Sequence, residues 1–175
     1  MANAEYYGVT GDKEYLSRAL KAYNIYWELW YGAEDPVGLP PKTEIKTRAG
    51  RNFGIPMICL NITNILMRVD SENIEFYKGR AIECIEDIFT NHVHPELECV
   101  LENVGPNGEA RVSFTEGRIV NPRHDIEAVW FILEYAKTTK DINLVKRAET
   151  IFHWATNSGW DEEYGGLLYF VDALG

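Results

Sequence analysis

Apolar side chains recur every three or four residues along most of the chain, which is the period of an amphipathic helix. Five stretches carry this period and are predicted to be helices: residues 12–31, 55–69, 71–92, 122–137 and 141–156. Gly32 is predicted to end the first helix, and the following residues 35–41, rich in proline and glycine, are predicted to form a loop. Residues 43–53 are basic and show no clear period.

Two other stretches have the composition of short strands. Residues 98–104 and 110–114 flank an Asn-Gly pair, which is typical of a tight hairpin turn. We therefore expect these two stretches to pair with each other as a β-hairpin. Residues 159–171 are punctuated by glycine and are also predicted to be strand-like.

A weak internal repeat relates the two ends of the chain. Residues 10–19 align with residues 138–148 through two aspartates, Asp12 and Asp141, each of which is placed to cap a helix. Repeated helix pairs indicate a solenoid or a closed toroid of helical hairpins, with a plain bundle as the alternative. Short hairpins between the helix pairs favour the toroid, so the fold class is predicted to be all-α.

Length, charge and cysteine content indicate what kind of protein this is and which partners it is expected to lack. A length of 175 residues is typical of a single domain, and a net charge of −10 argues against an electrostatic nucleic-acid surface. We expect no membrane association, because no apolar run approaches the length of a membrane span. Three cysteines at unpatterned spacing indicate reduced thiols in a cytoplasmic protein.

The start of the predicted helix at residues 122–137 carries a candidate base. Asn121 suits the N-cap, Pro122 suits the first helical position, and His124 follows in the first turn. Glu127, three residues on, shares a face with His124 and could fix its tautomer or bind a substrate hydroxyl. The positive helix end favours a neutral imidazole, which a general base requires. The alternative is that His124 merely fills a helix start. Asp125 is expected to be exposed.

Other motifs that carry chemistry are weak. His92 and His94 are spaced like a metal pair, but no third ligand accompanies them, so no metal site is predicted. No glycine-rich phosphate loop precedes a helix, and no arrangement of serine or cysteine with histidine indicates a covalent nucleophile.

Four ordered segments of the chain resemble the N-acylglucosamine 2-epimerase family, which includes the renin-binding proteins. Residues 121–136, NPRHDIEAVWFILEYA, resemble its Asn-Pro-Gly-His-x-x-Glu-x-x-Trp-Phe-Leu segment. Residues 54–62, GIPMICLNI, resemble a helix start, and residues 99–109, CVLENVGPNGE, resemble a Val-Leu-Glu-Asn-Val hairpin. Residues 157–175, NSGWDEEYGGLLYFVDALG, resemble a glycine-rich turn of the family.

The resemblance implies an (α/α)6 toroid of twelve helices, of which about five would lie in this chain. Residues 1–175 would then form an incomplete toroid, the middle of a longer enzyme that starts within a hairpin. We expect such a chain to be inactive alone and to associate with itself or with a missing partner segment, because a cut toroid exposes apolar helix faces.

The resemblance also implies a reaction. His124 matches the family histidine that removes the C2 proton of an N-acylglucosamine or N-acylmannosamine, and Glu127 matches its helical partner. Asn61 and Arg123 are expected to bind the sugar substrate, and neither a redox cofactor nor a metal is implied. Arg123 replaces a family glycine, which could recruit an acidic sugar. Alternatives are an aldose–ketose isomerase, a cellobiose-type 2-epimerase and a non-catalytic interaction protein.

Overall fold

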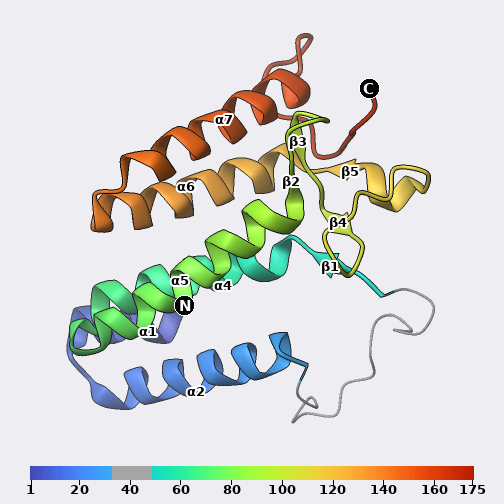
Figure 1. Ribbon diagram of the computed structural model, residues 1–175. Helices are drawn as coiled ribbons and strands as arrows, with labels where there is room; N and C mark the ends of the chain where they lie inside the picture. Colours follow the sequence, from blue (N-terminus) through green and yellow to red (C-terminus); the bar gives the residue numbers. More distant parts are fainter. Residues whose placement is uncertain (33–48) are drawn as a thin grey trace.

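Six α-helices in the described part of the chain form three antiparallel hairpins. The computed structural model describes residues 1–32 and 49–175. The hairpins pair α1 with α2, α4 with α5 and α6 with α7 (Figure 1). The first hairpin consists of α1 (Ala2–Thr10) and α2 (Lys13–Trp30), and the second of α4 (Gly54–Val69) and α5 (Ile74–Asp87). The third consists of α6 (Pro122–Thr139) and α7 (Ile142–Gly159). A 3-10 turn, Ser71–Asn73, precedes α5, and a π-helical turn, Ile88–His92, continues it.

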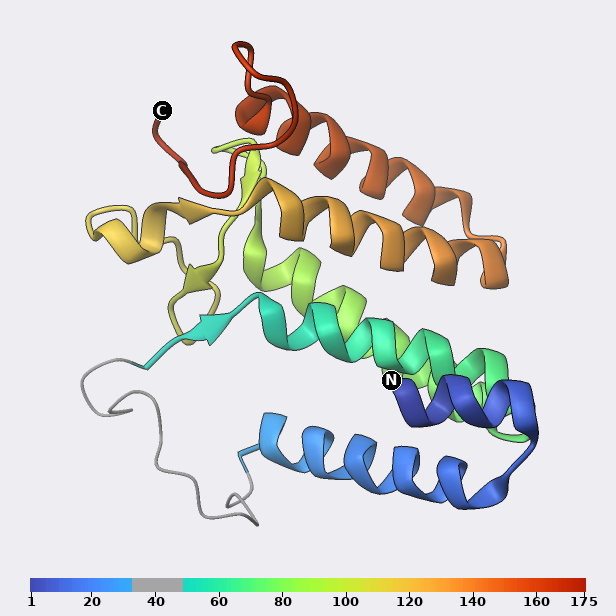
Figure 2. The same ribbon diagram turned by 180° about the vertical axis from the view of Figure 1, so that it is seen from behind.

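The three hairpins stack into two layers of helices. The first helices pack side by side, α1 on α4 and α4 on α6, and each second helix packs along its own partner (Figures 1 and 2). This is the layering of a toroid of helical hairpins, and the all-α prediction is confirmed. No described helix is long and apolar enough to cross a membrane.

The internal repeat marks the second helix of the first and third hairpins. Asp12 and Asp141 are the N-caps of α2 and α7, and both side chains accept hydrogen bonds from backbone N–H groups of the first turn. The residue before each cap has left-handed backbone, with φ of 71° at Gly11 and 60° at Lys140. The first and third hairpins are therefore each closed by a left-handed residue followed by a capping aspartate.

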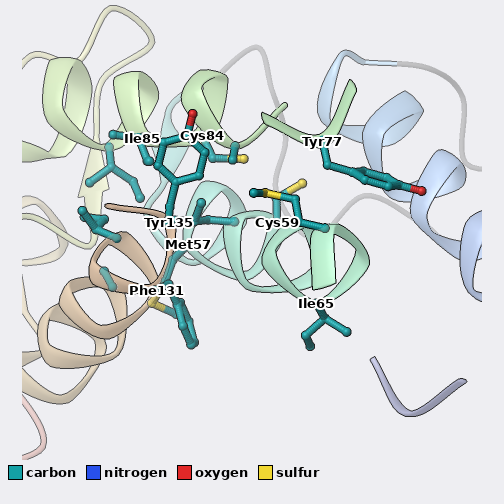
Figure 3. Close-up of a cluster of buried hydrophobic side chains, with 14 of the residues drawn as sticks. Met57, Cys59, Ile65, Tyr77, Cys84, Ile85, Phe131 and Tyr135 are labelled. Atoms are coloured by element: carbon teal, nitrogen blue, oxygen red, sulfur yellow. The ribbon is translucent and has the colours of Figure 1, made fainter. Parts of the chain in front are cut away.

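The core lies between the two layers. Met57 and Cys59 of α4, Cys84 and Ile85 of α5 and Phe131 of α6 gather in one buried cluster (Figure 3). Several polar groups within this core are paired, although Trp27 Nε1 has no hydrogen-bond partner among the described residues.

Tyr23 of α2 shares a 2.9 Å hydrogen bond with Thr63 of α4, and Tyr77 of α5 donates to Asp70 at 2.6 Å. These contacts tie both layers together without leaving the phenolic groups unsatisfied.

Three pairs of two-residue strands lie at the end of the molecule where α4 and α6 begin (Figure 1). All three pairs are antiparallel. Strand β1 (Arg51–Asn52) pairs with β4 (Asn103–Val104), and β2 (Val93–His94) pairs with β3 (Cys99–Val100). Strand β5 (Ile119–Val120) pairs with β6 (Val171–Asp172). The β1–β4 and β5–β6 pairs join segments that are far apart in sequence. The backbone of Glu102, just before β4, bonds both Phe53 before α4 and Ile119 before α6, which connects the beginnings of these two helices.

The predicted hairpin between residues 98–104 and 110–114 is wrong. The turn exists, with Gly108 at φ 81° donating to the Gly105 carbonyl at 3.0 Å. Residues 110–114, however, contain no strand, and β4 pairs instead with β1, which precedes α4. The strand-like prediction for residues 159–171 is met in part, by an isolated bridge between Trp160 and Leu167 and by the start of β6.

The remaining elements differ from the predictions in small ways. Four of the five predicted helices are confirmed to within a few residues, and the fifth, at residues 71–92, is divided into a 3-10, an α and a π segment. Helix α1 was not predicted; it has 9 residues and packs against α2, which has 18. The predicted loop at residues 35–41, and most of the irregular stretch at 43–53, lie outside the described residues.

Candidate functional site: a histidine and a buried glutamate

His124 lies in the first turn of α6, as predicted. Asn121 caps the helix, and its side-chain oxygen accepts from the backbone N–H of Arg123 at 3.2 Å and of His124 at 3.4 Å. Pro122 occupies the start of the helix. The cap fixes the backbone of His124, whose side chain stays 33% exposed and is therefore accessible from outside.

The imidazole of His124 is held by Glu102. Its Nδ1 lies 2.6 Å from Glu102 Oε1, and the glutamate side chain is only 9% exposed. Because a carboxylate accepts hydrogen bonds, this contact places the ring hydrogen of His124 on Nδ1. The Nε2 lone pair is then left free, on the ring edge that points away from Glu102.

The backbone of Glu102 is fixed on both sides. Its N–H donates to the Ile119 carbonyl at 3.0 Å, and its carbonyl accepts from the Phe53 N–H at 2.9 Å. Burial raises the pKa of the Glu102 carboxyl, and the neighbouring His124 partly offsets that effect. The histidine is thus the group that favours a charged Glu102.

Asp125 is buried, which corrects the expectation that it is exposed. Its side chain is 2% exposed, and Oδ1 has no hydrogen-bond partner among the described residues. Burial, and then the charge of Glu102, raise the pKa of Asp125 well above its usual range. Burial thus favours the neutral form of Asp125, whereas Glu102 is the carboxyl group that contacts the imidazole.

Glu127 does not contact His124 in the described structure. It is exposed, and the contact with the imidazole, one of the two roles considered for Glu127, is made by Glu102. The i, i+3 spacing places Glu127 next to Trp130, whose side chain is 58% exposed. Glu127 and Trp130 thus form an open face of α6 below the turn that carries His124.

The two predicted substrate-binding residues lie in different places. Arg123 donates to the Leu167 carbonyl at 3.1 Å, and its guanidinium lies 4.9 Å from the centre of the Tyr169 ring. Its side chain therefore connects the start of α6 with the C-terminal segment. Asn61 lies on α4 and contacts Met1 at 3.4 Å, so no described contact joins it to His124.

Glu102 is the residue of the candidate site that the sequence analysis missed. The available signal was that Glu102 directly follows the apolar residues Val100 and Leu101. An acidic side chain that is buried with such neighbours requires a partner. The two other histidines of interest are held separately. His92 bonds the Leu101 carbonyl, and His94 Nδ1 lies 3.0 Å from Glu96, so the pair does not converge. The described residues contain no cluster suited to a metal ion.

Known proteins with similar sequences belong to one family. The family described as N-acylglucosamine 2-epimerase (GlcNAc 2-epimerase) matches residues 42–175. N-acylglucosamine 2-epimerase of Rattus norvegicus is 35% identical over 99% of the chain, and that of Bos taurus is 36% identical over 100%. The human protein is 32% identical over 99% of the chain. The chain spans only about 41% of the length of the rat and bovine relatives.

Solved structures of sugar-converting enzymes share the fold. Cellobiose 2-epimerase from Bacillus thermoamylovorans B4167 superposes with a TM-score of 0.74 over 98% of this chain and 46% of its own, at 21% identity. A sugar epimerase from a ruminal bacterium gives 0.71 over 98% and 45%, at 18% identity. Both are (α/α)6 toroids, and the three hairpins correspond to part of that fold. The chain belongs to the N-acylglucosamine 2-epimerase family.

Proposed function

We propose that this chain carries the catalytic base of a sugar 2-epimerase that interconverts N-acylglucosamine and N-acylmannosamine. The observation that carries the proposal is the 2.6 Å contact between His124 Nδ1 and Glu102. A buried carboxylate that binds one ring nitrogen orients the imidazole and increases the basicity of the other nitrogen. The family relationship supplies the substrate class.

The proposed reaction begins with the open, aldehyde form of the sugar. The C1 carbonyl acidifies the C2–H bond. His124 Nε2 takes the C2 proton while the electrons of the C2–H bond form a C1–C2 double bond and the carbonyl electrons move onto the C1 oxygen, which gives an enolate. A proton returned to the opposite face of C2 inverts that carbon. His92, His94 and His153 have other partners, so we propose that the group returning the proton lies outside the described residues.

Substrate contacts are assigned to the open face of α6. Glu127 is exposed and accepts hydrogen bonds from sugar hydroxyls, and the exposed Trp130 ring packs against the apolar face of the sugar. Arg123 retains guanidinium nitrogens beyond the one bonded to Leu167 and binds polar groups of the substrate. Asn61 extends this surface along α4.

An aldose–ketose isomerase is the second candidate. It uses one base to move a proton from C2 to C1, which the single histidine at this site is able to do. D-mannose isomerase has a similar fold, with a TM-score of 0.58 over 75% of this chain and 33% of its own, at 17% identity. The same geometry also suits a cellobiose-type 2-epimerase, since the base is identical and only the sugar differs.

The compartment and the assembly are also proposals. We infer a cytoplasmic protein because Cys59, Cys84 and Cys99 are free and buried, which suits a reducing compartment. We infer self-association because Ile142 and Phe152 of α7 leave apolar side chains 66% and 42% exposed.

The reaction is tested by hydrogen exchange. The full-length protein is incubated in D2O with N-acetylmannosamine, mannose or cellobiose, and the products are read by proton NMR. Deuterium at C2 of an epimeric aldose supports the 2-epimerase, and a ketose product supports the isomerase. No exchange with any sugar contradicts both and leaves a non-catalytic interaction role.

Two variants separate the roles of the acidic residues. Glu102→Gln removes the carboxylate that orients His124, so kcat is expected to fall by about 10²-fold or more. Glu127→Gln removes an exposed substrate contact and is expected to raise KM more than it lowers kcat. Equal effects of both variants on kcat, with no effect on KM, would contradict this division.

A further inference from the structure

His92 is a buried histidine that the proposed reaction does not use. It ends the π-helical turn that continues α5, and its side chain is 0% exposed. Its ring lies against Phe53, with 5.5 Å between the ring centres. Burial lowers the pKa of His92, so the ring stays neutral. Short π-helical segments often occur at functional sites.

The ring of His92 binds the residue that precedes Glu102. His92 Nδ1 lies 2.9 Å from the Leu101 carbonyl oxygen, and a carbonyl only accepts, so Nδ1 is the donor. The Leu101 N–H in turn donates to the His92 carbonyl at 2.9 Å. Leu101 is therefore held by the backbone and by the side chain of the same residue.

The peptide group between Leu101 and Glu102 is consequently fixed at both polar ends. Its oxygen accepts from His92, and its N–H donates to the Ile119 carbonyl at 3.0 Å. The plane of this peptide sets the direction in which the Glu102 side chain leaves the backbone. That side chain ends 2.6 Å from His124, so a rotation of the peptide would move the carboxylate away from the imidazole.

We propose that His92 is a positioning residue, whose hydrogen bond to the Leu101 carbonyl fixes the Leu101–Glu102 peptide and so keeps Glu102 on His124. The inference rests on the proposed function only in calling His124 the base. Misplacement of a catalytic group by about 1 Å can cost about 10²-fold in rate. Holding a peptide at both ends prevents such movement.

The test compares two polar replacements that differ in where they place a donor. In His92→Asn, the side-chain amide nitrogen takes a position near that of Nδ1 and can still reach the Leu101 carbonyl. In His92→Gln, the amide nitrogen lies nearer the position of Nε2, so the donor is moved away. His92→Phe keeps the ring against Phe53 and removes the donor altogether. His94→Phe is the control, because His94 bonds Glu96 and not Leu101.

The first readout is the tautomer of neutral His124, measured by long-range proton–nitrogen NMR. This measurement is practical because the chain has four histidines. The hydrogen is expected on Nδ1 in the parent, in His92→Asn and in His94→Phe. In His92→Gln and His92→Phe, a mixture with the Nε2–H tautomer is expected. The second readout is kinetic: kcat falls about tenfold or more in the Gln and Phe variants, with KM within about twofold.

An unchanged His124 tautomer in folded His92→Gln would overturn the proposal, and so would identical behaviour of the Asn and Gln variants. If His92→Phe does not fold, the Asn and Gln pair still decides. The tautomer does not depend on turnover. A parent that shows the Nδ1–H tautomer but exchanges no sugar hydrogen therefore contradicts the proposed function and leaves this inference standing.

Discussion

Replacing Asp125 by asparagine is expected to remove a pH dependence from the stability of the fold. Asp125 is 2% exposed, and its pKa is raised well above the usual value of 3.8, chiefly by burial and then by the charge of Glu102. In the unfolded chain the carboxyl ionises normally. Asparagine has nearly the shape of the neutral acid but cannot lose a proton.

The sign and size follow from proton linkage. Between pH 3.8 and the pKa of Asp125 in the folded state, the native protein holds a proton that the unfolded chain has released. The free energy of unfolding of the parent therefore falls by about 1.4 kcal/mol for each pH unit in this window. The difference between Asp125→Asn and the parent rises by the same slope and levels off above the window.

Urea unfolding followed by tryptophan fluorescence, from pH 4 to pH 8, measures this difference. His92 has a lowered pKa, so it makes the folded protein less stable as the pH falls below its usual 6.5, but that effect is common to both proteins and cancels. Glu127→Gln is the control on the same helix, because Glu127 is exposed. A difference curve for Asp125→Asn that is as flat as the control curve would refute the buried neutral acid.

Three further predictions concern packing and surfaces. Ile85→Ala is expected to lower the free energy of unfolding by about 2–5 kcal/mol, because Ile85 is 0% exposed. Ile142→Ala, at a 66% exposed site, is expected to lower it by less than about 0.5 kcal/mol. Equal losses for the two variants in urea unfolding would contradict this. Arg123→Gly removes the bond to the Leu167 carbonyl and should speed amide exchange in residues 160–170 about fivefold, whereas unchanged exchange would contradict the contact. The 175-residue chain should self-associate at micromolar concentration through exposed apolar side chains of α7 such as Phe152, and a clean monomer in sedimentation would contradict that.

The helices were predictable because their signals are local. The caps Asp12, Asn121 and Asp141 and the apolar period placed α2, α6 and α7 from a few consecutive residues each. Helix α1 escaped because its start has no side-chain cap and it buries only Ala4. The false hairpin has a different cause. Its turn is local, but β4 pairs with β1 about fifty residues earlier, and tertiary packing selected that partner.

In the candidate site, too, the features set by neighbouring residues were predicted and the contacts between distant segments were not. The position of His124 in a capped first turn follows from neighbouring residues, and it was predicted. Its partner was not, because spacing of three along a helix pointed to Glu127, while the structure supplies Glu102 from a segment 22 residues away. Asp125 was expected to face solvent, but it is buried, close to Glu102 and Cys99 of another segment of the chain. Contacts between segments that are far apart in sequence leave no local pattern, so they cannot be predicted from neighbouring residues.

Exchange of the C2 hydrogen by the His124→Ala variant tests the central claim most directly. The full-length variant is incubated with N-acetylmannosamine in D2O, and its circular dichroism and urea midpoint are compared with those of the parent. Because His124 is partly exposed in a first turn, the fold should be nearly unchanged. The account predicts that C2 exchange falls by about 10²–10⁴-fold, and exchange within tenfold of the parent would show that His124 is not the base.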